Sequence, residues 1–527
     1  MGQTPVEEET TCKTRKRNSK TGTLGAIADD LRQVFRDGSY LVFANSRRTV
    51  EELGDLFRGD CELASDGEPA VALHHGSLAA PLRRRTEFML KSGKPTRAFC
   101  TSSLELGIDI GAVAAVGQID APWSVSSMVQ RLGRSGRKIG STSKLRLYVR
   151  VPSVETDAAL VDLLYPQLLQ AVAMVNLLLA GWLEPFKADR MHWSTLVHQV
   201  LSTIKEAGGK TALALYDSLC RKGPFRRVEA ADFRCLLQGL HEHDLVDQDS
   251  DNNIILGMTG EKITSAPGFY AAFSTPVELT ARWGAKQLGR LPWTEALKPG
   301  ECLLLNGQRW VVNNIDWKSK SIWVSPTVVK KPTVFLGGGG EIHDRIFQEM
   351  RHVLLGNEEP AWLDARSLDF LRSARETAHR VGLDTSDLLE LEDGVQWFPW
   401  VGTGTMRTLH LWAAQRGLAC SKNFLSLTFG EITLPDLGEH FAELAENGAD
   451  AVGLAAAMPN KDTERFDEYV PKALLEEANA TDRLDVASAR RAAQNAIGSS
   501  VQQEHEDRRR WHGRVPPMSC KHTRSSD

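Results

Sequence analysis

The sequence has few cysteines, and none are arranged to hold a metal or a disulfide framework. Eight cysteines are spread over 527 residues, and no two have the C-x-x-C spacing of a zinc knuckle. This scatter is typical of reduced thiols in a cytoplasm. The chain also has no apolar run of the ~18–20 residues that would cross a bilayer, and its N-terminus has no apolar signal-peptide core. We therefore expect a cytoplasmic protein without a metal site or a membrane segment.

Neither sign of charge dominates the chain. The 63 Lys and Arg and 67 Asp and Glu give a net charge of −4, which excludes a uniformly basic coat for nucleic acid. Residues 1–150 hold 23 basic against 17 acidic residues, whereas the remainder holds 40 against 50. Any contact with an anionic partner is therefore expected to be local.

The chain is too long for a single hydrophobic core, so a multidomain protein is expected. Residues 22–152 alternate between short apolar runs and amphipathic runs, which predicts an α/β domain with a doubly wound parallel sheet. Its five predicted strands are "SYLVFAN", "AVALHHG", "TRAFCTSS", "VAAVGQID" and "KLRLYVRV". Ligands of such sheets bind beyond the carboxyl ends of the strands, where the sequence places Ser46, Gly76, Thr101 and Asp120.

The rest of the chain divides into stretches of different character. Residues 153–187 are predicted to be a helical connector. In 188–265, three helical runs precede a hairpin with Asn252 and Asn253 at its turn, a pattern typical of an α+β winged helix. Residues 266–440 are first β-rich and then mixed, and 441–500 are helical without an assigned function. The polar ends, 1–21 and 501–527, are predicted to be disordered.

Two short stretches imitate phosphate-binding loops. "EAGGKT" ends in Gly209-Lys210-Thr211, but a P-loop needs another glycine where Ile204 stands. No strand-like run precedes it, so a helix end and a turn are predicted instead. "LGGGGEIHDR" is interpreted as a strand-to-helix turn, with an anion site as the alternative, and His343 and Asp344 alone do not make a metal site.

The stretch "SMVQRLGRSGRKIG", residues 127–140, carries three arginines between glycines. Arginine supplies planar, permanently charged groups, and a helix start with several of them suits a polyphosphate whose charge grows in a transition state. The glycines let the backbone approach such a ligand closely. A basic, solvated helix start that binds any anion is the alternative interpretation.

From residue 39 onward the chain resembles the superfamily 2 helicases. "QRLGRSGR" at 130–137 is similar to their motif VI, "TSSLELGIDIG" at 101–111 to motif V, and "LVFANSRRTVEEL" at 41–53 to motif IV. "HHGSL" at 74–78, the winged-helix pattern and "LGRLPW…GQRWVVNNID…GGGGEIHDRIFQEMR" narrow the resemblance to the Lhr type (large helicase-related), over roughly residues 22–440. It implies a second RecA-like domain at 22–152 and a β-barrel-like domain with an associated α/β region at 266–440.

The resemblance assigns catalytic and nucleotide-binding roles to five residues. Arg134 and Arg137 match the arginine fingers that stabilise charge on the γ-phosphate of ATP, and Gln130 would contact the same phosphate. Asp109 would bond the ribose, and Gly107 would allow the tight turn beside it. A plain turn is the alternative for Asp109.

A second set of residues is implied for the bound strand. Thr101 would hydrogen-bond a backbone phosphate, while Ser46, Arg47, His75 and Gly76 would flank the strand. An exposed helix start is the alternative for Arg47. The family implies single-stranded nucleic acid as the partner, with DNA in preference to RNA.

The β-rich stretch concentrates tryptophan. Residues 269–340 hold five of the thirteen, at 283, 293, 310, 317 and 323. Aromatic rings beside cations can stack bases, whereas tryptophans at alternate strand positions often face a core. We expect most of them to be core residues, with Trp283 as the first candidate to stack on a base. In the predicted winged helix, the turn before the third helix is basic, and it is either a phosphate contact or a solvated turn: Arg221, Lys222, Arg226, Arg227.

The sequence lacks the motifs that the first RecA-like domain of such a motor carries. It contains neither G-x-x-x-x-G-K-[ST] nor D-E-[AV]-[DH]. ATP and Mg²⁺ would be held mainly by that missing domain. We expect the C-terminal half of an Lhr-type helicase, inactive as an ATPase by itself and completed by a separate polypeptide. The alternatives are a stand-alone nucleic-acid-binding module and a nonfunctional fragment.

Overall fold

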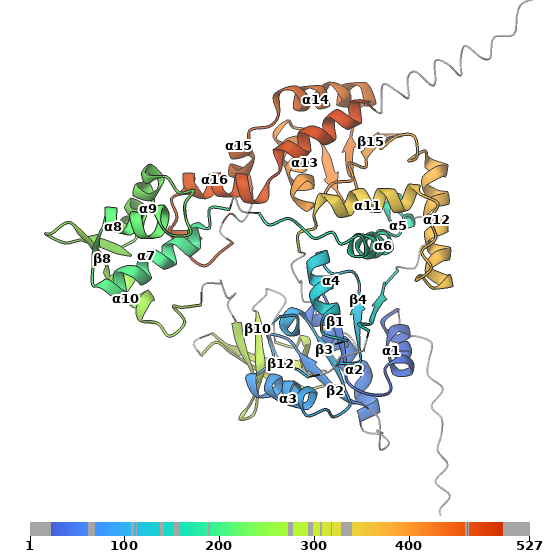
Figure 1. The fold of residues 1–527 in the computed structure, drawn as a ribbon, viewed down its shortest axis with the longest axis horizontal. Coiled ribbons are helices and arrows are strands. Elements are labelled where there is room, and N and C mark those ends of the chain that lie inside the picture. Colours follow the sequence, from blue (N-terminus) through green and yellow to red (C-terminus); the bar gives the residue numbers. More distant parts are fainter. Residues whose placement is uncertain are drawn as a thin grey trace, which may run out of the picture.

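A computed structural model gives the fold of most of the chain (Figure 1). It describes residues 23–61, 69–106, 110–111, 113–136, 142–151, 158–187, 190–271, 278–292, 299–305, 308–317, 319–327, 340–458, 461 and 463–498. The two predicted disordered ends lie outside the described residues, as do Gly107, Asp109, Arg137 and Trp293.

The first unit is the predicted parallel sheet, which the structure confirms. Its strands are β1 (Tyr40–Ala44), β2 (Ala70–His74), β3 (Thr96–Cys100), β4 (Ala115–Ile119) and β5 (Leu145–Tyr148). They run in the order β2-β3-β1-β4-β5 with every pairing parallel. Every residue of β1 and β3 is buried, because helices cover both faces of the sheet. Those helices are α1 (Thr23–Val34), α2 (Arg47–Cys61), α3 (Ala80–Lys91) and α4 (Val125–Leu132).

A helical layer joins this unit to the C-terminal part of the chain. It contains α5 (Leu160–Leu163), α6 (Pro166–Leu179), α11 (Asp344–Leu355) and α12 (Ala365–Val381). α6 is apolar on nearly all sides because it packs between α4 and α11 (Figure 1). Within the described residues, no helix has the length and hydropathy needed to span a membrane.

Residues 193–265 combine helices with a small antiparallel sheet. The elements are α7 (Trp193–Ala207), β6 (Lys210–Thr211), α8 (Ala212–Tyr216), η2 (Asp217–Arg221), α9 (Ala230–Glu242), β7 (Val246–Gln248), β8 (Asn253–Leu256) and α10 (Met258–Ser265). Gly208, at φ 74°, ends α7, so "EAGGKT" is a helix end and a turn as predicted. The predicted hairpin is confirmed, but Asn253 already belongs to β8, and only Asn252, at φ 61°, lies in the turn.

The β-rich stretch forms a second five-stranded sheet. Its strands are β9 (Glu278–Trp283), β10 (Lys286–Pro292), β11 (Cys302–Leu305), β12 (Gln308–Asp316) and β13 (Ser321–Pro326), in the order β10-β9-β13-β12-β11. A β-barrel-like domain was expected, and the pairings among the described residues form a sheet with β10 and β11 at its two edges.

The edge strand β10 is bonded to the first unit. The Arg290 N–H donates to the Ser77 carbonyl at 2.7 Å, and Leu78 forms a bridge with Gly289. A side chain at Gly289 would overlap the Ser77 carbonyl, so this approach requires glycine. The second sheet therefore lies against the loop that follows β2.

The C-terminal residues form a third mixed unit. A four-stranded antiparallel sheet has the order β14-β15-β17-β16, from β14 (Leu388–Leu391), β15 (Gly394–Trp397), β16 (Cys420–Lys422) and β17 (Leu427–Gly430). The accompanying helices are α13 (Thr403–Gln415), α14 (Leu434–Asn447), α15 (Ala451–Ala456), the turn η3 (Asp467–Tyr469) and α16 (Lys472–Arg483), and residues 486–498 are also helical.

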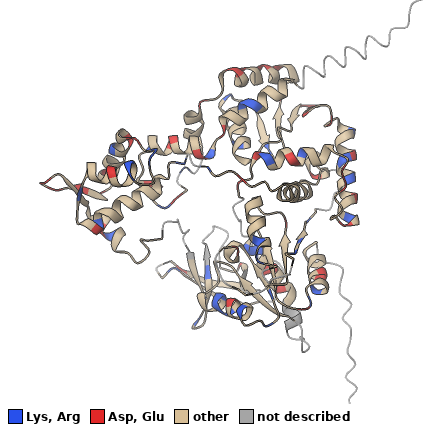
Figure 2. Ribbon diagram, in the orientation of Figure 1, with Lys and Arg blue, Asp and Glu red and all other residues tan. Residues whose placement is uncertain are grey.

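The segment without a functional account, 441–500, is a structural bridge over its described residues. Phe466 and Leu474 join the core around α7 and α9, whereas Phe441 and Ala493 join the core around β15 and α13. Basic and acidic residues intermix in every part of the fold, as the sequence indicated, and no unit is uniformly basic (Figure 2).

Candidate nucleotide and nucleic-acid site

The motif VI-like stretch begins on the last turn of helix α4 and continues into the turn that follows it. The Ser124 hydroxyl accepts a hydrogen bond from the Ser127 N–H at 3.1 Å and so caps the start of the helix. The helix ends at Gly133, and the chain turns at Gly136 with φ 71°. Gln130 is exposed on its last turn.

Arg131, to which sequence reasoning gave no role, is the buried centre of this region. Its Nε donates to Glu105 Oε2 at 2.9 Å, and its Nη1 donates to Gln118 Oε1 at 2.6 Å. The guanidinium lies 5.2 Å from the centre of the Phe43 ring. The side chains of Arg131 and Glu105 are 5% and 9% exposed, so this is a buried ion pair that joins α4 to the segment following β3. In the sequence, the only indication of this ion pair was a third arginine in the motif VI-like stretch and a glutamate in the motif V-like stretch.

Arg134, a predicted arginine finger, is also buried. Its Nε and Nη2 donate to the main-chain carbonyl of Glu105 at 3.1 Å and 2.5 Å, and the residue is 6% exposed. The guanidinium is therefore held against the motif V-like segment. Glu105 bonds Arg131 through its carboxylate and Arg134 through its carbonyl, so hydrogen bonds tie the two motif-like segments together.

The turn after α4 closes tightly on the start of β5. The Ser135 hydroxyl accepts from the Lys144 N–H at 3.0 Å, and the Ser143 hydroxyl donates to the Ser135 carbonyl at 3.0 Å. A Cβ at Gly136 would lie 2.5 Å from the Ser143 Oγ and 2.6 Å from its backbone nitrogen. Only glycine fits this turn, which is the last described point before Arg137.

The start of α4 is held by a residue that sequence reasoning missed. Glu184, in the segment between α6 and α7, accepts from the backbone N–H of Val125 at 2.6 Å and of Ser126 at 3.0 Å. The Ser126 hydroxyl also donates to it at 2.6 Å. Burial acts to raise the pKa of Glu184, but these hydrogen bonds outweigh it and hold the pKa below the ordinary value. Since 58 residues or more separate the partners, the sequence carried no local signal for this cap.

Replacing Glu184 with glutamine is expected to lower the free energy of unfolding by about 1 kcal/mol at pH 7, because the cap loses its charge. The lowered pKa means that the wild-type carboxylate contributes above its ordinary pKa of 4.5 and loses that contribution as the pH falls through the lowered value. Thermal unfolding at several pH values should therefore show the two proteins converging in acid. The control is Glu439→Gln, because Glu439 is exposed on α14. This substitution should leave the free energy of unfolding unchanged at both neutral and acidic pH. Equal effects of the two substitutions would contradict the capping role.

The residues predicted to flank a strand do gather at one edge of the sheet. Ser46 caps α2 by accepting from the Thr49 N–H at 3.1 Å. Arg47 is exposed beside it, and its Nη1 donates to the Ser77 hydroxyl at 2.5 Å. Thr101 follows β3, is half-buried, and its hydroxyl makes no capping bond to the turn that follows. These residues come from neighbouring strands at their carboxyl ends.

The side chain of His75 is buried and faces α2. Its Nε2 lies 2.7 Å from Glu51 Oε1, both side chains are buried, and its Nδ1 has no hydrogen-bond partner. The ring therefore fastens the loop after β2 to α2. The next residue, Gly76, is exposed with open space around its Cα, so the loop presents backbone at that point.

The tryptophans of the second sheet are mostly exposed, and the expectation that most are core residues is wrong. Trp310 is 2% exposed and donates to the Leu305 carbonyl, as a core residue does. Trp283, Trp317 and Trp323 are 46%, 55% and 39% exposed. Trp283 packs its ring against Trp310 with 5.5 Å between the centres, so its outer face remains open. The sequence showed that the tryptophans alternate along the strands. It did not show which face of the sheet is covered by another unit.

Comparisons with known proteins agree with the geometry of the first unit. The family model described as helicase conserved C-terminal domain matches residues 26–139. An Lhr helicase/probable uracil glycosylase of Mycolicibacterium smegmatis is 30% identical over 227 residues, which are 38% of this chain and 14% of that protein. An ATP-dependent helicase Lhr-Core of Sulfolobus acidocaldarius is 39% identical over 113 residues, which are 21% of this chain and 13% of that protein.

The fold agrees over a longer stretch than the sequence does. The structure of Mycobacterium smegmatis helicase Lhr bound to ssDNA and AMP-PNP matches with a TM-score of 0.51 and 19% identity, and the match covers 92% of this chain and 65% of that chain. The chain thus contains a helicase C-terminal domain and matches Lhr helicases over part of their length.

Proposed function

We propose that this chain is the C-terminal part of an ATP-dependent, Lhr-type nucleic-acid helicase or translocase, to which it contributes arginine fingers and strand-binding surface. The observation that carries the proposal is the double attachment of Glu105 to Arg131 and Arg134. It couples the segment that would contact the strand, through Thr101, to the helix that would contact ATP. A simple nucleic-acid-binding module has no use for such a coupling.

The nucleotide-facing role falls to α4 and the turn after it. Gln130 is exposed, Arg134 is fixed about one helical turn further on, and Gly136 directs the chain toward Arg137. Guanidinium groups fixed in advance stabilise the charge that develops on a transferred phosphoryl group, because no reorganisation is needed at the moment of reaction. Asp109 would bond the nucleotide ribose from the neighbouring segment, and Gly107 would allow the tight turn beside it.

In this proposal, the residues that hold magnesium and most of the nucleotide belong to another domain. The described residues contain no group of three His, Cys, Asp or Glu side chains placed to hold a metal ion, and the sequence has neither a P-loop nor a D-E-x-H box. A first RecA-like domain, supplied by another polypeptide or segment, would hold ATP and Mg²⁺ against Gln130, Arg134 and Arg137.

The strand would follow the carboxyl edge of the parallel sheet and continue to the second sheet. Arg47 and Thr101 offer a charge and a hydroxyl, and Gly76 offers open backbone. The hydrogen bond between β10 and the loop after β2 joins the second sheet, with its exposed tryptophans, to the first unit. Single-stranded DNA is the proposed ligand, since the M. smegmatis helicase of similar fold was solved bound to ssDNA. Residues 188–265 would add a winged helix with a basic turn.

Replacing Trp283 with alanine is expected to weaken binding of a single-stranded oligonucleotide about tenfold, because one base-stacking contact is worth ~1–3 kcal/mol. Fluorescence anisotropy of a labelled strand measures the change. Trp362→Ala removes an equally exposed ring, 43% against 46%, from a different unit and should leave affinity unchanged. Trp283→Phe should keep most of the affinity. If the two alanine variants bound the strand with identical affinity, Trp283 would not be part of the binding surface.

The purified chain alone is the direct test of the division of labour. It should bind single-stranded DNA with an affinity that falls steeply with salt, and it should hydrolyse no ATP. ATP hydrolysis by the chain alone, stimulated by the strand and free of contaminating enzyme, would contradict the proposal. Absence of strand binding would leave only the nonfunctional fragment.

A further inference from the structure

Helix α3 presents a row of basic side chains to solvent. Arg84, Arg85, Phe88 and Lys91 are all exposed, and their spacing of three, four and seven residues places them on one side of the helix. Within the described parts of the chain, none of the three cations forms an ion pair or a hydrogen bond through its side chain. We call this side of the helix the α3 face.

The charge around the α3 face is positive even when every acidic residue is counted. Residues 80–94 hold five Lys and Arg against Glu87 alone, which is a net charge of +4. The hairpin of β9 and β10, residues 278–292, holds three against one, which is a net charge of +2, and its Lys286 is exposed. The whole chain carries −4, so the positive charge is concentrated here (Figure 2).

The α3 face adjoins the proposed path of the single strand. The loop that leads into α3 is bonded to β10, since the Arg290 N–H donates to the Ser77 carbonyl at 2.7 Å and the Ala79 N–H donates to the Leu288 carbonyl at 3.4 Å. The Ser77 hydroxyl also accepts from Arg47, one of the residues proposed to flank the strand. The two surfaces are therefore continuous (Figure 1).

The acidic residue of α3 ties the helix to the motif V-like segment. Glu87 Oε1 lies 3.1 Å from His74 Nε2, and His74 Nδ1 lies 2.8 Å from the hydroxyl of Ser103. His74 is buried at the end of β2, and Ser103 follows Thr101 by two residues. A partner that docks on α3 would thus contact a helix that is hydrogen-bonded, through one histidine, to the segment proposed to hold the strand.

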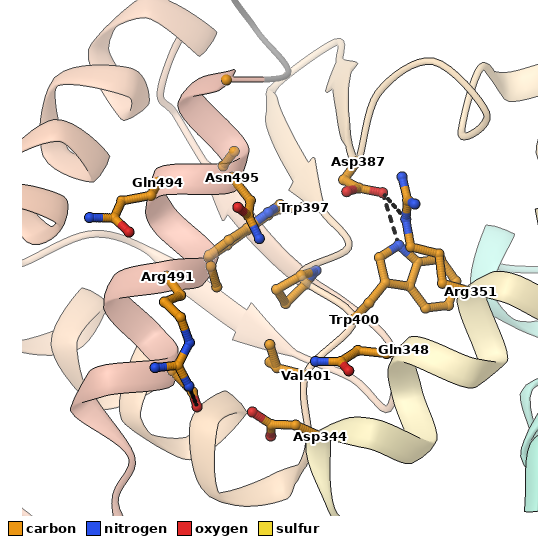
Figure 3. A pocket seen from close by; sticks show the side chains of 15 residues that line it. Asp344, Gln348, Arg351, Asp387, Trp397, Trp400, Val401, Arg491, Gln494 and Asn495 are labelled. Carbon is orange, nitrogen blue, oxygen red and sulfur yellow. Dashed lines mark hydrogen bonds and ion pairs between the residues drawn. The ribbon is translucent and has the colours of Figure 1, made fainter. Parts of the chain in front are cut away.

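A cavity of about 630 Å³ in the C-terminal unit shows what a balanced surface looks like (Figure 3). Its lining contains two acidic residues, Asp344 and Asp387, and two basic residues, Arg351 and Arg491. Asp387 accepts from Arg351 Nε at 3.0 Å, and Arg491 Nη2 donates to the Ser488 hydroxyl at 2.8 Å. Positive charge is matched by negative charge in that cavity, whereas on the α3 face it is not.

We propose that the α3 face docks the phosphate backbone of double-stranded DNA next to the bound single strand. The proposal rests on the strand-binding function proposed above and adds a second form of nucleic acid to it. Arg84, Arg85 and Lys91 would contact phosphates, with Lys286 of β10 beside them.

The shape and chemistry of the α3 face fit a duplex better than a single strand. Sites for single strands combine a groove with several stacking rings, whereas the α3 face is the convex side of a helix with one exposed ring, Phe88. Duplex DNA carries about one charge per 1.7 Å of its axis, about twice the density of one strand, so an unpaired row of cations gains more from it. Contacts of this kind position a duplex without reading its sequence.

The test compares two labelled ligands of the full chain by fluorescence anisotropy. One is a single-stranded oligodeoxythymidylate of about 20 nucleotides, longer than the ~4–16 nucleotides of one OB-fold site. The other carries the same tail on the 3′ or the 5′ end of a duplex of about two helical turns, ~10 base pairs each. The wild type should bind a tailed duplex more tightly than the tail alone.

The variant Arg84→Gln/Arg85→Gln removes two exposed charges from the α3 face. We expect about tenfold weaker binding of the tailed duplex, unchanged binding of the tail alone, and a salt slope smaller by about 1.8 for the tailed duplex, at ~0.9 per phosphate contact. Arg366→Gln/Arg380→Gln removes two exposed arginines from α12 and is the matched control. Arg84→Lys/Arg85→Lys keeps the charge and should keep most of the affinity.

Other outcomes would overturn the proposal. If the glutamine variant bound both ligands as the wild type does, or lost affinity equally for both, the α3 face would not be a duplex site, and the proposed function would stand. Competition by polyglutamate as effective as by unlabelled duplex would assign the face to an acidic protein segment instead. A wild type that binds the tailed duplex but not the tail would contradict the proposed strand surface alone. Binding of neither ligand would contradict both.

Discussion

Replacing Arg131 with methionine is expected to lower the free energy of unfolding of the residue 23–151 unit by about 3–5 kcal/mol. Methionine fills a similar volume but leaves the Glu105 carboxylate buried without its cation and Gln118 Oε1 without its 2.6 Å donor. An uncompensated buried charge costs far more than a lost surface contact. Hydrogen exchange of the α4 and β4 amides would report the loss within this unit of a multidomain chain.

A matched control for Arg131 exists in the same unit. Arg146 pairs with Asp30 at 2.9 Å, but the two side chains are 48% and 36% exposed, so Arg146→Met should cost less than about 1 kcal/mol. The double variant Arg131→Met/Glu105→Leu removes the whole buried pair and should regain part of the loss. If Arg131→Met cost no more than Arg146→Met, the buried pair would not hold the two motif-like segments together.

Alanine at Gly136 is expected to cost about 2–5 kcal/mol and to displace the turn that leads to Arg137. The positive φ of 71° accounts for about 1–2 kcal/mol, and the close approach to Ser143 accounts for the rest. Gly93→Ala separates these causes, since Gly93 has φ 72° but nothing within 4 Å of an added Cβ. Hydrogen exchange around β5 should show the larger effect for Gly136→Ala. Equal effects of the two substitutions would mean that the tight contact with Ser143 is not a constraint.

The parallel sheet was predictable because its signal is local. Each strand is a short apolar run bounded by polar residues, and the strand ends differ from the prediction by only a few residues. The positions of Ser46, Gly76 and Thr101 at one edge then follow from the parallel arrangement alone. The strand order of the second sheet was harder to predict from the sequence, because it depends on pairings between strands that are distant in the chain.

The chemistry of individual side chains was harder to predict, because it depends on distant partners. Glu184 caps a helix 58 residues or more away, and Arg131 meets a glutamate 26 residues away. His75 and Arg134 carry the residue types of exposed ligands, yet tertiary packing buries both. The tryptophans alternate as core residues do, but only packing decides which sheet face stays open.

The central claim is that this chain completes an ATPase whose P-loop lies elsewhere. The direct measurement is ATP hydrolysis, with single-stranded DNA present, by the chain alone and by the chain mixed with a first RecA-like domain of an Lhr-type helicase. Each reaction is repeated with Arg134→Ala, and strand binding is measured in parallel.

The account predicts activity only in the mixture, and a fall of about a thousandfold or more with Arg134→Ala, which is the scale of an arginine finger. Retained strand binding by Arg134→Ala would show that the loss concerns catalysis. Full activity of the Arg134→Ala mixture would contradict the catalytic role of this arginine. A mixture that binds the strand but hydrolyses no ATP would contradict the central claim and leave a nucleic-acid-binding module.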